Sequence, residues 1–195
     1  MTLAPFVTEL FNRSLLTGTV PQAFKAAFIT PIITKEGLDA ADVKSYRPIS
    51  NLTVLSKLLE RLVAGQMKDY IDKYHLLPDF QSAYRIHHST ETAVLKVSSD
   101  ILQAVDEGDI GVLVLLDLSA AFDTVDHQIL LQRLSVSCGF GGMVRDWFDS
   151  YLEGRTQHVE YLGSKSTDTV VTCGVPQGSV LGPFCSSYTL RTSVN

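Results

Sequence analysis

The sequence predicts an α+β fold in which helices pack against a mainly antiparallel sheet. Apolar residues recur at helical spacing in two stretches, residues 3–16 and 52–74. Residues 155–162 and 166–173 alternate between apolar and polar, as expected for the two strands of a hairpin. Between these regions, residues 112–117 begin as an apolar run and end in a carboxylate, which is typical of a central strand buried on both faces.

Size and composition limit the class of protein. The chain has 195 residues and a net charge of −5, which counts against a strongly basic surface without excluding a nucleic-acid partner. The three cysteines are far apart and form no CxxC pair, so we expect neither a zinc site nor a disulfide framework. No apolar stretch reaches the roughly 18 residues of a membrane span and no signal peptide is evident, so we expect an intracellular protein with no membrane partner.

The first half of the chain is predicted to alternate between helices and strands. The helix at residues 3–16 ends at Gly18, which tolerates the left-handed conformation of a helix end. A strand follows at residues 24–33, and Pro31 within it favours an edge position because proline has no N–H. Ser50 or its neighbour Asn51 is expected to cap the helix at residues 52–74.

The second half of the chain is predicted to hold three further helices before a rigid turn. They span residues 89–105, 126–137 and 143–152, and Asp126 is expected to cap the second of them. Residues 174–179 then form a turn that opens a final helix.

Asp117 is the first candidate for chemistry. At the end of a buried strand a carboxylate is within reach of solvent or a cation, and Mg²⁺ prefers oxygen ligands. Phe122 then supplies a flat wall, and Asp123 supplies a second carboxylate. The alternative is that Asp117 is only a turn residue or a helix cap.

Four motifs decide between these alternatives. They occupy residues 46–50, 81–90, 116–123 and 174–183, and read YRPIS, QSAYRIHHST, LDLSAAFD and GVPQGSVLGP. In this order and with these gaps they resemble the reverse transcriptase domain of non-LTR (LINE-type) retrotransposons, over residues 3–183 or so. The resemblance implies the fingers and partial palm of a right-hand polymerase. It implies an RNA-directed DNA polymerase that uses two Mg²⁺ ions, or Mn²⁺, with an RNA template, a DNA primer and deoxynucleoside triphosphates as partners.

The resemblance also implies roles for individual residues. Asp117 matches the first catalytic carboxylate, which binds both metal ions, and the backbone carbonyl of Leu118 matches a second ligand. Phe122 matches the bulky residue that excludes a ribose 2′-hydroxyl, although ordinary core packing explains an aromatic residue equally well. Gln177 and Gly178 match the residues that line the incoming-nucleotide pocket, and the alternative is a plain turn before a helix.

Four more residues match contacts to phosphate or template. Lys35 and Arg47 match basic residues of the fingers that contact the triphosphate, and the alternative for each is a solvated surface charge. Gln81 and Arg85 match a motif near the template strand, although residues 83–84 read Ala-Tyr where the family usually has glycine and phenylalanine.

One family motif does not occur. The family's third metal-binding motif ends in two adjacent aspartates, and no such pair occurs in this sequence. From Phe184 onward the sequence looks polar and unpatterned, so we expect a partial reverse transcriptase domain at residues 1–183 and a divergent tail at residues 184–195. Because one carboxylate and one carbonyl cannot hold two divalent ions, this chain alone is predicted not to polymerise DNA.

Two other functions compete with this one. The chain is alternatively a remnant that binds nucleic acid without catalysis. A phosphohydrolase using Asp117 as its nucleophile is a third reading, but such enzymes need a second acid two residues on, where this chain has Ser119. The resemblance implies a nuclear or cytoplasmic location, and the oligomeric state stays open.

Overall fold

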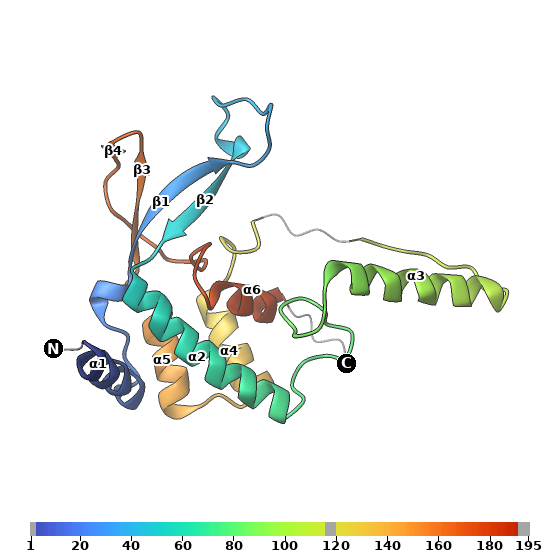
Figure 1. The fold of residues 1–195 in the computed structure, drawn as a ribbon, viewed down its shortest axis with the longest axis horizontal. Coiled ribbons are helices and arrows are strands. Elements are labelled where there is room, and N and C mark those ends of the chain that lie inside the picture. The colour runs from blue at the N-terminus through green and yellow to red at the C-terminus, as the bar shows by residue number, and fades with distance from the viewer. Residues whose placement is uncertain (1–2, 116–119, 191–195) are drawn as a thin grey trace.

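The computed structural model describes residues 3–115 and 120–190, which form a small sheet above a layer of helices (Figure 1). The α-helices are α1 (Ala4–Thr17), α2 (Val54–Lys73), α3 (Thr90–Asp106), α4 (His127–Cys138), α5 (Gly142–Leu152) and α6 (Gly182–Leu190). The strands are β1 (Ala26–Ile33), β2 (Tyr46–Asn51), β3 (Thr156–Tyr161), β4 (Ser164–Lys165) and β5 (Thr169–Val170). The predicted α+β class is confirmed.

The sheet has the strand order β2-β1-β3-β4, and β5 also pairs with β3. Strand β1 pairs antiparallel with β2, and β3 pairs antiparallel with β4 and β5, whereas β1 and β3 run parallel. The sheet is therefore mainly antiparallel, as predicted. Pro31 was expected to mark an edge strand, which is wrong for β1 as a whole because β1 lies between β2 and β3. The β3 register ends at Ile29, so Pro31 pairs on the β2 side alone and its missing N–H costs no bond to β3.

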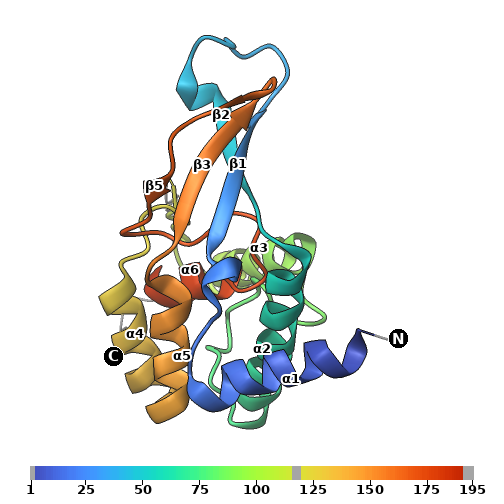
Figure 2. The same cartoon turned by 90° about the vertical axis from the view of Figure 1, so that its left-hand side faces the viewer.

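The helices α1, α2, α4, α5 and α6 lie beneath the sheet (Figure 2), and they share one hydrophobic core. Each contributes buried apolar side chains, among them Phe11, Leu59, Leu130, Phe148 and Tyr188. Trp147 on α5 donates its ring N–H to the Ser14 hydroxyl at 3.1 Å, which satisfies a polar atom inside this core. Among the described residues, no helix is long and apolar enough to cross a membrane.

The helix ends follow the local sequence. Asp126 caps α4 by accepting a hydrogen bond from the backbone N–H of Ile129 at 2.9 Å, as predicted. Thr53 caps α2, whereas Ser50 and Asn51, the expected caps, belong to strand β2.

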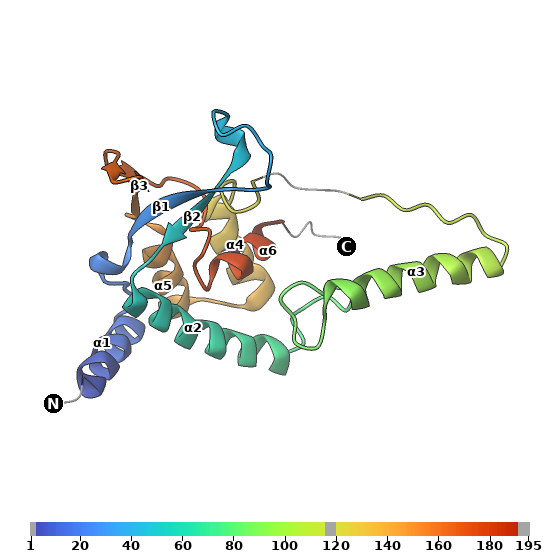
Figure 3. The same cartoon turned by 45° about the horizontal axis from the view of Figure 1, so that its top comes forward.

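The predicted central strand is wrong for its described part. Residues 111–115 are extended but pair with no described strand, and Val112 and Leu115 are 80% and 83% exposed. The segment instead runs back along α3, which projects from the body of the molecule (Figures 1 and 3). A strand buried on both faces needs neighbours on both sides, and the described strands pair with one another instead.

The C-terminal part also departs from expectation. The predicted strand at residues 166–173 is reduced to β5, because only Thr169 and Val170 pair with β3. The predicted final helix is confirmed as α6, which continues past Pro183 to residue 190. The divergence of residues 184–195 from the family stays a prediction. Cys185 and Tyr188 are buried, so this helix is part of the core.

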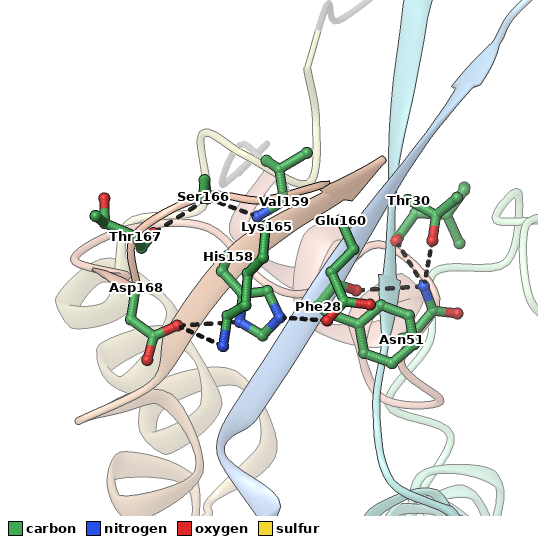
Figure 4. A network of polar contacts seen from close by, with 11 residues as sticks. Phe28, Thr30, Asn51, His158, Val159, Glu160, Lys165, Ser166, Thr167 and Asp168 are labelled. Atoms are coloured by element: carbon green, nitrogen blue, oxygen red, sulfur yellow. Dashed lines mark hydrogen bonds and ion pairs between the residues drawn. The ribbon is translucent and has the colours of Figure 1, made fainter. Parts of the chain in front are cut away.

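One face of the sheet carries a polar network (Figure 4). His158 lies between two carboxylates, with ring nitrogens 3.0 Å from Glu160 and 3.1 Å from Asp168. Asn51 donates to the Thr30 hydroxyl at 2.9 Å on the same sheet. The ion pairs of His158 and Lys165 with Asp168 tie β3 and β4 to the loop after β4.

Candidate functional site

Two of the four motifs meet at the free edge of β2. The backbone N–H of Ser50 donates to the carbonyl oxygen of Gln177 at 2.7 Å. Gly178 follows with a φ of +115°, and a Cβ built there would lie 2.8 Å from the Ser50 carbonyl oxygen. Glycine is therefore required at this position both for the backbone angle and for the close approach.

A third motif joins the same turn through its backbone. The N–H of Val175 donates to the carbonyl of Phe122 at 2.8 Å, and the N–H of Gly174 donates to the carbonyl of Val125 at 2.7 Å. Gly174 has a φ of +85°, and a Cβ there would lie 3.0 Å from the Cα of Asp123. The segment that follows Asp117 in the sequence is thus held against residues 174–175.

The start of α6 packs against these segments. Phe122 is half-buried, and its ring approaches Gly182, where a Cβ would lie 3.3 Å from the ring. Ser186 donates its hydroxyl hydrogen to the carbonyl of Ala121 at 2.9 Å. Phe122 therefore has the packing environment of a core residue, while its proposed role beneath a sugar stays a prediction.

Strand pairing decides which face each residue occupies. Arg47 is exposed and pairs with Ile32, so its side chain leaves β2 on the opposite face from Pro48 and Ser50. A Cβ on Gly178 would lie 3.7 Å from a methyl group of Ile49, which shares the face of Arg47. The turn at Gly178 therefore packs against the edge of β2 beside Ile49, a residue on the sheet face that carries Arg47.

A cavity of about 380 Å³ lies on the other face of β2. Its lining includes Ser50, Asp123 and Gln177, together with Gln157 and the exposed thiol of Cys173. Gln177 stands at the edge of the strand and is half-buried. The turn that carries it therefore separates this cavity from the Arg47 face.

The remaining predicted contacts lie on either side of this edge. Lys35 is exposed in the loop that connects β1 to β2, two residues after the last strand pair, which joins Ile33 and Tyr46. Gln81 and Arg85 line a separate cavity of about 240 Å³ over α2 and α6. Arg85 donates to the carbonyl oxygen of Asp79 at 3.1 Å, so part of its guanidinium serves its own loop.

Asp117 and Leu118 lie outside the described residues, so their predicted roles stay predictions. Within the described part of the chain, no group of three or more His, Cys, Asp or Glu side chains is arranged to hold a metal ion. Asp123 is exposed, and its backbone N–H bonds to the carbonyl of Ala120 at 2.9 Å. The described donor set does not by itself fit a pair of divalent ions.

Glu60 is a site residue that sequence reasoning missed. It lies on α2 and is 1% exposed, and its Oε2 accepts hydrogen bonds from the backbone N–H groups of Val180 (2.7 Å) and Leu181 (3.1 Å). The available signal was a charged residue on the buried stripe of α2, one position after Leu59 and three before Val63.

Buried charge affects the ionisable groups around Glu60. The pKa of the Cys185 thiol is raised to about 12, chiefly by burial and also by the negative charge of Glu60, while Arg155 opposes the shift. Burial likewise raises the pKa of the Tyr151 hydroxyl well above its usual range. The buried negative charge of Glu60 and the buried positive charge of Arg155 thus act with opposite sign on the groups around them.

Comparison with known proteins gives one family. A family model described as "Reverse transcriptase (RNA-dependent DNA polymerase)" matches residues 33–195. The chain is 38% identical over 194 residues to the RNA-directed DNA polymerase from mobile element jockey of Drosophila melanogaster, covering 97% of the chain and 21% of that protein. It is 37% identical over 184 residues to the probable RNA-directed DNA polymerase from transposon BS of the same species, covering 93% of the chain and 20% of that protein.

A less similar relative is a retrovirus-related protein of another organism. The Pol polyprotein from type-1 retrotransposable element R2 of Popillia japonica is 29% identical over 173 residues, covering 87% of the chain and 23% of that protein. The chain therefore belongs to the reverse transcriptase family, and its relatives support a segment of the non-LTR, LINE-type branch. It spans about a fifth of the length of these relatives. Reverse transcriptases as a family use divalent metal ions, a nucleic-acid template and nucleotide substrates.

Proposed function

We propose that this chain supplies the fingers and part of the palm of an RNA-directed DNA polymerase. One observation carries the proposal: backbone hydrogen bonds bring three sequence motifs to one place, through Ser50 and Gln177 on one side and Phe122 and Val175 on the other. The bonds join backbone groups, so the arrangement does not depend on side-chain rotamers. A deoxynucleoside triphosphate would bind where the turn meets the edge of β2.

The residues around this edge would each contact a different part of the nucleotide. The guanidinium of Arg47 and the ammonium of Lys35 would contact the triphosphate, since both are exposed on the β1–β2 hairpin. Gln177 and Gly178 would border the sugar and base, and the absence of a Cβ on Gly178 lets the turn lie close against the Ser50 carbonyl oxygen. Gln81 and Arg85, on their separate cavity, would lie nearer an RNA template paired with a DNA primer.

The metal requirement falls on residues outside the described part. Asp117 and the carbonyl of Leu118 would hold Mg²⁺ or Mn²⁺, because both offer oxygen ligands. Such ions, when bound, neutralise phosphate charge and activate a primer hydroxyl. Because the sequence holds no adjacent aspartate pair, we propose that this chain alone binds substrates without polymerising them.

The experiment measures binding and extension separately. We expect the unchanged chain to bind 2′-deoxythymidine 5′-triphosphate in the presence of Mg²⁺ and a primed RNA template, and Gln177→Ala to weaken that binding about tenfold. Gln128→Ala, at an exposed position on α4, is the matched control and should leave the affinity unchanged. Equal affinity in the Gln177 and Gln128 variants would contradict the proposed site. Primer extension by the unchanged chain, if it is lost in Asp117→Ala, would contradict the proposed lack of polymerisation.

A further inference from the structure

Glu60 is a carboxylate buried in the protein interior, where its charge has lost contact with water. It is 1% exposed in the middle of α2, and it is the one acidic side chain among the buried residues of the described ranges. A buried carboxylate is costly unless hydrogen bonds compensate for the lost water. The partners of Glu60 therefore indicate what it does.

Its partners are the backbone amides of the two residues that precede α6. Oε2 accepts from the N–H groups of Val180 and Leu181, and Oε1 accepts from the Ser56 hydroxyl at 3.3 Å. The next N–H, that of Gly182, donates to the Ser179 hydroxyl at 2.9 Å. The first amides of a helix have no partner inside the helix, and their dipole favours a negative charge. Glu60 thus caps α6 from a different helix.

The amides that Glu60 holds immediately follow the turn that carries Gln177. On its other side the same turn is fixed to β2, through the bond from Ser50 to Gln177 and the close approach of Gly178. The turn is therefore attached to the sheet at one end and to α2 at the other. Movement of either attachment would change where Gln177 lies relative to the strand of Arg47.

A second buried charge lies in the same region. Arg155 is 1% exposed and donates to the carbonyl of Tyr151 at 2.8 Å, with its guanidinium 4.7 Å from the centre of the Tyr151 ring. Arg155 and Glu60 act with opposite sign on Tyr151 and on Cys185, which places both charges within electrostatic reach of these groups. The positive charge of Arg155 partly offsets the negative charge of Glu60, while the carboxylate of Glu60 keeps its hydrogen bonds to the two amides.

We propose that Glu60 is a positioning residue that clamps the turn of residues 176–179 and thereby holds Gln177 at the nucleotide site. The proposal rests on the proposed function for the role of Gln177, but the clamp itself is a property of the fold. The neutral variant Glu60→Gln keeps an oxygen that can face the amides while it removes the charge, so the chain retains its packing.

The clamp is tested by amide hydrogen exchange in the whole chain. We expect the Val180 and Leu181 amides to exchange about fivefold or more faster in Glu60→Gln than in the unchanged chain. Glu9→Gln, at an exposed position on α1, is the matched control and should change neither amide. Leu134→Ala removes a buried core side chain on α4 and destabilises the whole chain, so it should raise exchange at many protected amides together. Exchange at Val180 and Leu181 that does not rise selectively in Glu60→Gln would overturn the clamp.

The role at the nucleotide site needs a second measurement. We expect Glu60→Gln to weaken binding of 2′-deoxythymidine 5′-triphosphate at least about threefold more than Leu134→Ala does, because the turn is displaced while the core is intact. Binding that is weakened by Gln177→Ala but not by Glu60→Gln would overturn the positioning role and leave the proposed function in place. An unchanged chain that binds no nucleotide would overturn the proposed function alone, because hydrogen exchange reads the clamp directly.

Discussion

The N–H of Ser50 on the edge strand β2 donates to the carbonyl oxygen of Gln177, 2.7 Å away, in the turn before α6. An edge strand usually presents unpaired backbone groups to solvent, and here the turn satisfies one of them. The bond joins the strand that carries Arg47 to the segment that carries Gln177, although the two are far apart in the sequence.

Gly178→Ala should destabilise the chain by about 2–4 kcal/mol, because the new Cβ meets the Ser50 carbonyl oxygen at 2.8 Å and the φ of +115° disfavours alanine. Gly65→Ala is the control with the opposite sign. It lies inside α2 with open space around it, so it should stabilise by about 0.5–1 kcal/mol. Urea unfolding measures both, and equal effects would contradict the close approach at Gly178.

Leu130→Ala should cost about 2–5 kcal/mol of unfolding free energy, since the side chain is fully buried and its loss leaves a cavity. Val136→Ala on the same helix removes a side chain that is 79% exposed and should change the free energy by less than about 0.5 kcal/mol. Comparable losses in the two variants, measured by thermal or urea unfolding, would mean that α4 packs through a different face.

The cysteines should differ in reactivity. Cys173 is exposed, whereas Cys138 and Cys185 are buried, so a thiol reagent at pH 8 should modify one thiol in the folded chain and all three in denaturant. Modification of Cys138 or Cys185 in the folded chain would contradict the burial of α4 or of α6, respectively.

The thiol of Cys185 also predicts a pH dependence of stability. Its pKa is about 12 in the folded chain against 9.0 in the unfolded one. Below pH 9 both states keep the proton and the thiol contributes no pH dependence. Between pH 9 and about 12 the unfolded state loses the proton first, so the free energy of unfolding should fall as the pH rises. Cys185→Ala should reduce this slope, and an unchanged slope from pH 9 to 11 would contradict the prediction.

The segment at residues 110–115 should be the first site of limited proteolysis. Its apolar side chains are exposed, and no described strand pairs with it, so a protease that cuts beside large apolar residues can bind it in extended form. Mass spectrometry of early fragments should place the first cuts there or in α3, before any cut in α2. Early cuts in α2 with residues 110–115 intact would mean that this segment is paired after all.

The sequence by itself determined the helices and the family. Helical spacing and caps such as Asp126 act within a few residues, so the local pattern was enough to predict α2 and α4 closely. The four motifs indicated a reverse transcriptase for a similar reason, because each one is a short contiguous run.

Only the tertiary structure decided how these parts are joined. The run at residues 112–115 has the composition of a buried strand, but a strand forms only where a neighbouring strand offers backbone partners, and such partners come from distant parts of the chain. Likewise, no residue near Glu60 in the sequence predicts that its carboxylate contacts Val180. Contacts of this kind depend on how the helices and the sheet pack, and no pattern within a few residues encodes them.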